Sequence, residues 1–201
     1  MDLEVLPLFS SPVGILILEE DFSLMANSIS RLNFIESGSY NFSYSDRRKI
    51  LDDFPEVKEI MMSYFNLYKD EVLNLGPTDF AITTSWITQT GKGGYSHEHR
   101  HSNSLYSCVF YFDDGDGGQL EFSGNPSTSI FELNYGSNDN IYNTDSIEVK
   151  PRKNMLVIFP SNLEHRVLEN TSDMYRYSLA FNLFPVGSLS DFDSGISLSV
   201  S

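Results

Sequence analysis

Basic residues and cysteines are scarce in this sequence of 201 residues, and each scarcity excludes a class of function or structure. The chain has 13 Lys and Arg against 28 Asp and Glu, which gives a net charge of −15. Such an acidic surface repels a phosphate backbone, so we expect no direct binding to nucleic acid. The single cysteine, Cys108, excludes an intramolecular disulfide and lies in an apolar run, which predicts a small buried side chain in a reducing compartment.

Long apolar runs and a basic N-terminal segment are missing as well. No run approaches the ~20 apolar residues of a membrane-spanning helix. The sequence opens with Met1-Asp2-Leu3-Glu4, which lacks the positive charge of a secretory signal. We therefore expect a cytoplasmic protein without membrane contact.

Helical patterns come first along the chain, whose length suits one domain with a sizeable core. Residues 13–18 form a short apolar run typical of a strand, and residues 21–32 indicate a helix. From 55 to 75 the apolar residues recur at helical spacing, with Pro55 in the first turn and Gly76-Pro77 as the stop. This stretch predicts an amphipathic helix that packs on a core.

Short β-rich runs separated by Gly, Asn, Asp and Pro follow Gly76. They cover residues 79–89, 95–101, 104–113, 118–123, 129–134, 145–150, 154–159, 163–169 and 174–184. About eight strands at this spacing predict a sandwich or jelly roll. The predicted fold class is α+β, mainly β, with two or three N-terminal helices on one outer face of the sandwich.

We expect one domain over residues 1–201. It divides into a strand and helical part over 1–78, a jelly-roll core over 79–185 and a polar tail over 186–201. The tail, rich in Ser, Asp and Gly from Gly187 on, is expected to be loosely held. Residues 87–96 and the polar loop 135–144 are expected to shape substrate selectivity.

All four histidines fall in two places, because three alternate between His97 and His101 and the fourth is His165. Alternate residues of a strand share a face, so His97, His99 and His101 would point the same way, toward a His165 on a neighbouring strand. Imidazole is the commonest protein ligand of divalent transition metals. A structural zinc site normally recruits several cysteines, so histidines with open metal positions favour a redox metal such as Fe(II).

A second polar pattern follows His165. Residues 176–182 alternate polar and apolar, which places Arg176, Ser178 and Asn182 on one face of a strand. An arginine on the inner face of a sandwich is costly unless it meets an anion. Because a guanidinium binds a carboxylate through two hydrogen bonds and a hydroxyl adds another, the pattern predicts a site for an anionic ligand. A pair with an internal Asp or Glu is the alternative.

Four ordered segments of the chain look like the motifs of one known family. Residues 93–95, 99–111, 151–165 and 176–184 are similar to G-G-Y, H-x-H-P-x-S…S-G-V-Y-Y, P-x-x-G-x-L-x-x-F-P-S-x-L-x-H and R-x-S-x-x-F-N. These motifs resemble those of a 2-oxoglutarate- and Fe(II)-dependent oxygenase family common in bacteria and tailed phages. Ser102, Cys108 and Asn154 replace a Pro and two Gly of that pattern, which are local turn or packing changes.

The resemblance implies a double-stranded β-helix and an enzyme, a 2-oxoglutarate-dependent dioxygenase. Its cofactors would be Fe(II), 2-oxoglutarate as cosubstrate and O2, with ascorbate as a reductant. It would hydroxylate an unactivated C–H bond of a peptide or small molecule and release succinate and CO2. The resemblance also implies a cytoplasmic protein of a bacterium or of an infected bacterial host, and it leaves a homodimer open.

The same resemblance suggests the roles of individual residues. The superfamily usually begins its metal site with H-x-D or H-x-E, and here no Asp or Glu stands two residues after any His. We therefore expect the metal ligands His99, His101 and His165, with His97 as the alternative ligand or a carboxylate from elsewhere. The cosubstrate would meet Arg176 and Ser178, assisted by Tyr111 and Asn182; these four residues and the metal ligands make up the expected site. Glu98 and Arg100 would point to the opposite face.

Two other functions remain open from the sequence. Three histidines also suit a cupin-like metal dioxygenase that works without 2-oxoglutarate. A jelly-roll binding or structural protein without catalysis, such as a phage accessory protein, is the other alternative. Arg176 and Ser178 favour the 2-oxoglutarate-dependent enzyme over the cupin-like one, which does not require an anion clamp. A protein without catalysis would form no succinate from 2-oxoglutarate.

Overall fold

The computed structural model describes residues 4–7, 10–115, 117–124, 140–141, 144–190 and 193–200. The strand expected at 129–134 and most of the loop expected at 135–144 lie outside these ranges. Within them, no helix has the length and apolar character needed to cross a membrane.

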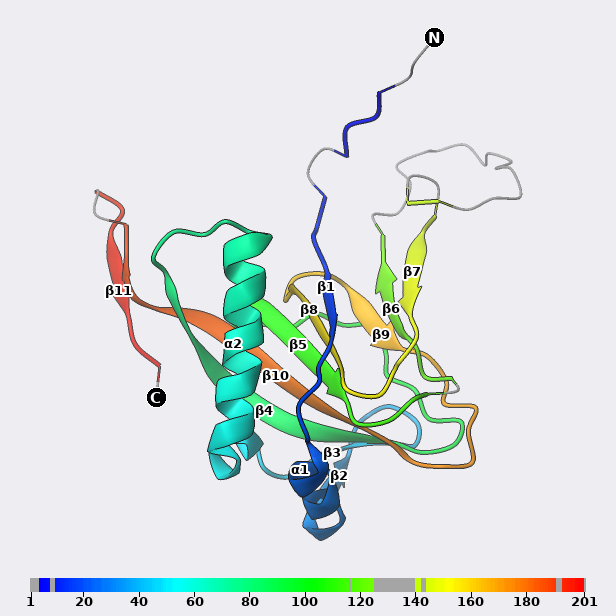
Figure 1. The fold of residues 1–201 in the computed structure, drawn as a ribbon. Helices are drawn as coiled ribbons and strands as arrows, with labels where there is room; N and C mark the ends of the chain where they lie inside the picture. The colour runs from blue at the N-terminus through cyan, green and yellow to red at the C-terminus, as the bar shows by residue number, and fades with distance from the viewer. Residues whose placement is uncertain are drawn as a thin grey trace.

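Two antiparallel sheets make up the β-rich part of the described chain (Figure 1). The large sheet has the order β1 (Gly14–Ile17), β8 (Met155–Pro160), β5 (Tyr106–Tyr111), β10 (Arg176–Leu189), β4 (Asp79–Thr90), β3 (Phe42–Ser45), β2 (Phe34–Glu36), and β11 (Ile196–Leu198) pairs with β10. The small sheet has the order β7 (Ser146–Val149), β6 (Leu120–Ser123), β9 (His165–Val167). A mainly β, jelly-roll fold with few helices is therefore confirmed.

The helices come from the first part of the chain and include α1 (Ser23–Ser28) and α2 (Pro55–Glu71), with short 3-10 turns η1 (Ile29–Arg31) and η2 (Ile50–Asp53). Pro55 opens α2, where its missing N–H costs nothing. The buried face of α2 packs on the large sheet, and the ring of Phe65 lies 5.0 Å from that of Phe80 and 5.6 Å from that of Tyr106 (Figure 1). Burying one such ring stabilises the fold by about 1.5–3 kcal/mol.

Alternation along the strands gives the large sheet two different faces. Phe110, Leu156 and Phe181 belong to the core cluster that includes α2. Their chain neighbours Tyr111 and Val157 belong to a second cluster, shared with the small sheet. Because successive side chains of a strand point to opposite faces, one face of the sheet holds α2 and the other is turned toward β6 and β9.

Several elements differ from the sequence expectations. The stretch 95–101 is not a regular strand, since only His99 forms a single bridge there, to His165. Strands β2 and β3 were not expected, because both are short and Ser37, Gly38 and Ser39 lie between them. β3 pairs with β4 and β2 pairs with β3, and these ladders supply the backbone hydrogen bonds.

The end of the chain is also more ordered than its composition indicates. Strand β10 continues through the expected start of the tail to Leu189, and β11 returns along it with Ser188 opposite Ser197. The helix α2 ends at Glu71, one turn before the expected residue 75. Asn154 adopts φ +57° in the turn before β8, which is the left-handed conformation that Asn tolerates in place of Gly.

Candidate active site

Register between β4 and β10 aligns the polar side chains on the face of the large sheet opposite α2. Four residues of β4 lie directly opposite four of β10, in the pairs Thr90–Arg176, Thr88–Ser178, Trp86–Ala180 and Thr84–Asn182. The next strand continues two of these rows, because Ser178 lies opposite Tyr111 and Asn182 opposite Ser107 on β5. As expected from the alternation, Arg176, Ser178 and Asn182 therefore share one face.

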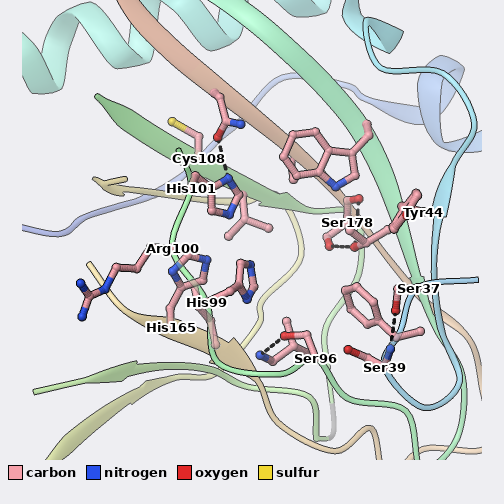
Figure 2. A pocket seen from close by; sticks show the side chains of 18 of the residues that line it. Ser37, Ser39, Tyr44, Ser96, His99, Arg100, His101, Cys108, His165 and Ser178 are labelled. Carbon is pink, nitrogen blue, oxygen red and sulfur yellow. Dashed lines mark hydrogen bonds between the residues drawn. The ribbon is translucent and has the colours of Figure 1, made fainter. Parts of the chain in front are cut away.

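Three of the four histidines gather at one end of these rows (Figure 2). His165 opens β9, and the backbone N–H groups of His99 and His165 each donate to the other's carbonyl, at 2.9 and 3.0 Å. The N–H of His101 donates to the carbonyl of Ser161 at 3.0 Å. In each of the three imidazoles one ring nitrogen lies within 4.8 Å of its counterparts, and the described part of the chain adds no Asp, Glu or Cys to the group.

Hydrogen bonds define which ring nitrogen of each histidine is free. Nδ1 of His99 lies 2.8 Å from the carbonyl oxygen of His97, and Nδ1 of His165 lies 2.8 Å from that of Leu163. A carbonyl oxygen only accepts, so both Nδ1 atoms carry the proton. Each Nε2 then keeps its lone pair, which is the arrangement of histidines that bind a metal with the second nitrogen fixed by an outer partner.

The third imidazole is held by a side chain. Nδ1 of His101 lies 2.9 Å from Oδ1 of Asn182, which also accepts from Ser107 Oγ at 2.8 Å. Nδ2 of Asn182 donates to Thr84 Oγ1 at 3.1 Å, which is consistent with Oδ1 as the acceptor and His101 as the donor. Asn182 was expected beside the cosubstrate, and its described contacts instead orient His101.

Burial keeps two of the three histidines neutral. It lowers the pKa of His165 to about 3 and that of His101 to about 4, and the neighbouring imidazoles add to both shifts. Because only the neutral imidazole binds a metal, these two side chains are ready to do so at physiological pH.

His97 does not join the three histidines. Its side chain is exposed and its ring packs edge-on against Tyr95, with centroids 5.5 Å apart. Its carbonyl orients His99, and its own N–H donates to Ser39 Oγ at 3.2 Å. Glu98 accepts from Ser123 Oγ, and Arg100 Nη2 lies 3.0 Å from Glu164, extending away from the imidazoles in Figure 2.

Arg176 is buried without an anionic partner. It is 7% exposed, and neither Nε nor Nη1 has a hydrogen-bond partner. Its one described hydrogen bond runs from Nη2 to Thr90 Oγ1 at 3.5 Å, and no described carboxylate forms a salt bridge with it. Burial lowers the pKa of Arg176, but a guanidinium stays charged in proteins. A buried charge in this state fits an anionic ligand better than the internal pair that was the alternative.

The ring of Tyr111 lies next to this guanidinium, and Ser178 follows Arg176 two residues later on the same face of β10. The central carbon of the guanidinium is 5.6 Å from the centre of the Tyr111 ring, and the Tyr111 hydroxyl is buried without a partner. Burial raises the pKa of Tyr111, so its phenol stays a neutral donor. Ser178 Oγ lies 2.5 Å from Thr88 Oγ1. Unpaired buried donors are costly, so Arg176 and Tyr111 together indicate a missing acceptor.

A cavity of about 520 Å³ is lined by residues of both groups, although Arg176 itself is not part of its wall. His99, His101 and His165 line it, as do Tyr111 and Ser178. The lining also includes Trp86, whose ring stacks on His101 with centroids 5.8 Å apart. Trp86 could not be identified as a cavity residue from the sequence, because its place follows from its register opposite Ala180.

A known family matches the part of the chain that contains this site. Residues 84–182 match the model of the family described as "Putative 2OG-Fe(II) oxygenase". The matched range contains the three histidines, Tyr111, Arg176 and Asn182. No curated protein matches the sequence.

Solved structures with the same fold are similar to this chain at low sequence identity. HygX from Streptomyces hygroscopicus, crystallised with nickel, 2-oxoglutarate and hygromycin B, has a TM-score of 0.62 at 10% identity, over 86% of this chain and 82% of its own. A prolyl hydroxylase from Trichoplax adhaerens, in complex with a hypoxia inducible factor peptide fragment, has a TM-score of 0.59 at 14% identity, over 86% and 83%. A Pseudomonas putida prolyl-4-hydroxylase has a TM-score of 0.55 at 18% identity, over 87% and 92%.

Proposed function

Because the chain belongs to the 2-oxoglutarate- and Fe(II)-dependent oxygenase superfamily, we propose that it hydroxylates a C–H bond of a small molecule or peptide. The overall reaction converts R–H, 2-oxoglutarate and O2 into R–OH, succinate and CO2. The observation that carries the proposal is that imidazole nitrogens able to bind a metal and buried donors without an acceptor lie close to one cavity. Three imidazoles converge in its wall with one ring nitrogen each, and the buried donors of Tyr111, also in the wall, and of the neighbouring Arg176 lack an acceptor.

The residues present fit both groups that the family requires. Three neutral nitrogen donors suit Fe(II), and the buried guanidinium beside a phenol suits a carboxylate. His99, His101 and His165 would hold the iron, while Arg176 and Tyr111 would bind the C5 carboxylate of 2-oxoglutarate. Bound together, iron, 2-oxoglutarate and O2 supply the oxidising power of the reaction.

The remaining residues orient and shield these groups. The carbonyls of His97 and Leu163 and the amide of Asn182 fix the three ring orientations. Val109, Leu120 and Phe159 give the cavity apolar walls, which exclude water from the reacting atoms. Three neutral ligands carry one negative charge fewer than two histidines and a carboxylate, so we expect weaker iron binding than at such a site.

Uncoupled turnover tests the proposal without knowledge of the substrate. The protein is incubated with Fe(II), 2-oxoglutarate, O2 and ascorbate, and succinate is measured by mass spectrometry. We expect slow succinate formation by the wild type and none by His165→Ala. Arg176→Met should raise the concentration of 2-oxoglutarate needed, whereas Arg47→Met, on an exposed residue paired with Asp53, should change nothing.

Two other results would replace the proposal. Iron binding without any affinity for 2-oxoglutarate would favour the cupin-like dioxygenase, which needs no buried guanidinium. Failure to bind either group would favour a jelly-roll protein without catalysis.

A further inference from the structure

The wall of the cavity carries no carboxylate in the described part of the chain, although the sequence has 28 Asp and Glu. Besides histidines, the described lining contains two basic side chains, Arg48 and Arg100. Within a protein of net charge −15, this lining is locally favourable to anions, because the described wall of the cavity holds no Asp or Glu that would repel them.

Arg48 and Arg100 differ in what they contact. Arg100 is paired with Glu164 and extends away from the imidazoles (Figure 2). The guanidinium carbon of Arg48 lies 4.0 Å from the centre of the Tyr44 ring, and no described carboxylate forms a salt bridge with it. Its neighbour Arg47 is the residue that binds Asp53. Arg48 is therefore the guanidinium available to a ligand in this part of the cavity.

The backbone that carries Arg48 is fastened to β4. The N–H of Ser85 donates to the carbonyl of Arg48 at 2.8 Å, and the N–H of Leu51 donates to Ser85 Oγ at 2.9 Å. Ser45 Oγ accepts from the N–H of Ile87 at 3.1 Å. Since Tyr44 covers one face of the guanidinium, the N–H groups along its edge remain free to bind an oxyanion through two hydrogen bonds.

The position of Arg48 separates it from the cosubstrate residues. Tyr44, Thr88, Ser178 and Tyr111 lie opposite one another on four neighbouring strands. At a strand spacing of about 4.8 Å, Tyr44 is roughly 14 Å from Tyr111, over whose ring Arg176 lies. A 2-oxoglutarate with one carboxylate at Arg176 and the other on iron has none left for Arg48. The anion that Arg48 binds must then come from another molecule.

We infer that the substrate is an anionic small molecule whose carboxylate is bound by Arg48 against the Tyr44 ring. This inference rests on the proposed function and adds its substrate class. The body of the substrate would lie along Trp86, which faces the same cavity and stacks on His101, so that the C–H bond to be oxidised lies near the three histidines.

Equilibrium binding of a matched acid and amide tests the inference. Benzoate and benzamide are titrated into protein saturated with Mn(II) and 2-oxoglutarate in the absence of O2. Ligand-observed NMR gives the dissociation constants, and the fluorescence of Trp86, the only tryptophan of the chain, is followed in parallel. We expect benzoate to bind about tenfold more tightly than benzamide, the effect of one charge-assisted contact.

Two variants show where this preference arises. Arg48→Gln should abolish the preference for benzoate, whereas Arg47→Gln, which removes the same charge one residue away, should preserve it. Equal affinity of acid and amide for the wild type would overturn the inference, as would a preference that survives Arg48→Gln.

The same titration on a second variant of the protein distinguishes a failure of this inference from a failure of the proposed function. If the protein fails to bind Mn(II) or 2-oxoglutarate, the same titration is made with metal-free Arg176→Met, in which Arg48 is the remaining anion site. A benzoate preference that needs Arg48 there would support the Arg48 site while the proposed function is lost. Normal binding of 2-oxoglutarate without any benzoate preference would reject the Arg48 site alone.

Discussion

Nδ1 of His101 donates to Oδ1 of Asn182 across 2.9 Å, which ties an imidazole of the candidate metal site to the middle of β10. The strand that carries Arg176, the proposed anion-binding residue, therefore also orients a proposed metal ligand. The two halves of the candidate site, one for the metal and one for the carboxylate, share this strand.

Replacing Asn182 should weaken metal binding without removing a ligand. In Asn182→Leu, Nδ1 of His101 loses its acceptor, so ring orientation and tautomer are no longer fixed. We expect the dissociation constant of Fe(II), measured anaerobically by competition with a chelator, to rise about 10–100-fold. Thr84→Val removes only the hydrogen bond on the other side of Asn182 and should leave it within about threefold. Unchanged affinity in Asn182→Leu would show that the backbone alone holds His101.

Replacing Arg176 should separate stability from ligand binding. Because Nε and Nη1 lack partners, Arg176→Met removes an uncompensated buried charge. We expect the free energy of unfolding of the ligand-free protein to stay equal or rise by about 1–3 kcal/mol in denaturant titration. The increase in melting temperature on adding 2-oxoglutarate should disappear. Strong destabilisation together with normal 2-oxoglutarate binding would assign Arg176 a purely structural role.

Gly118 should be as sensitive as Arg176 itself, although it carries no functional group. A Cβ at this position would overlap Nη1 and Cζ of Arg176, and the backbone has φ +63°. Gly118→Ala is therefore expected to displace the guanidinium and to raise the dissociation constant of 2-oxoglutarate, measured by calorimetry, at least tenfold. The left-handed backbone adds a strain of about 1 kcal/mol to the folded state. Gly187→Ala, with φ +84° and no atom within 4 Å of the added Cβ, is the matched control and should bind normally. Equal affinities of the two variants would contradict the placement of Arg176.

Acid should destabilise the metal-free protein through its buried histidine. The unfolded chain binds a proton at His165 as the pH falls through about 6.5, but the folded chain does not until the pKa of His165, about 3. The contribution of His165 to the free energy of unfolding is thus fully present above pH 6.5. It is lost below that pH, by at most about 1.4 kcal/mol per pH unit. Urea titrations between pH 7 and 5 measure the slope, which His165→Gln should reduce. A slope unaffected by that substitution would place a protonated His165 in the folded state.

Some parts of the site follow from the sequence because they depend on periodicity. The alternation of residues 176–182 indicated that Arg176, Ser178 and Asn182 share a face, and β10 places them so. The selection of His99 and His101 over His97 could not come from the same rule, because residues 95–101 are not a regular strand. Backbone contacts with His165 and Ser161, made by residues about sixty positions away, determine which rings converge.

Other parts depend on which strands become neighbours. The sequence does not state that Tyr111 lies opposite Ser178, or that Thr84 lies opposite Asn182. Tyr44 and Arg48 were not singled out from the sequence, since β3 has only four residues and is defined by its pairing with β4. Such tertiary neighbours arise from sheet order and register, which local propensity does not contain.

The hairpin of β2 and β3 has a consequence for how enzymes of this kind diversify. Tyr44 and Arg48 precede the range 84–182 that matches the family model, whereas the histidines and Arg176 lie within it. The proposed contact with the carboxylate of the substrate thus comes from a different stretch of the chain than the proposed metal and cosubstrate residues. Mutations in residues 34–51 are therefore expected to alter which anions the protein accepts while leaving His99, His101, His165 and Arg176 in place.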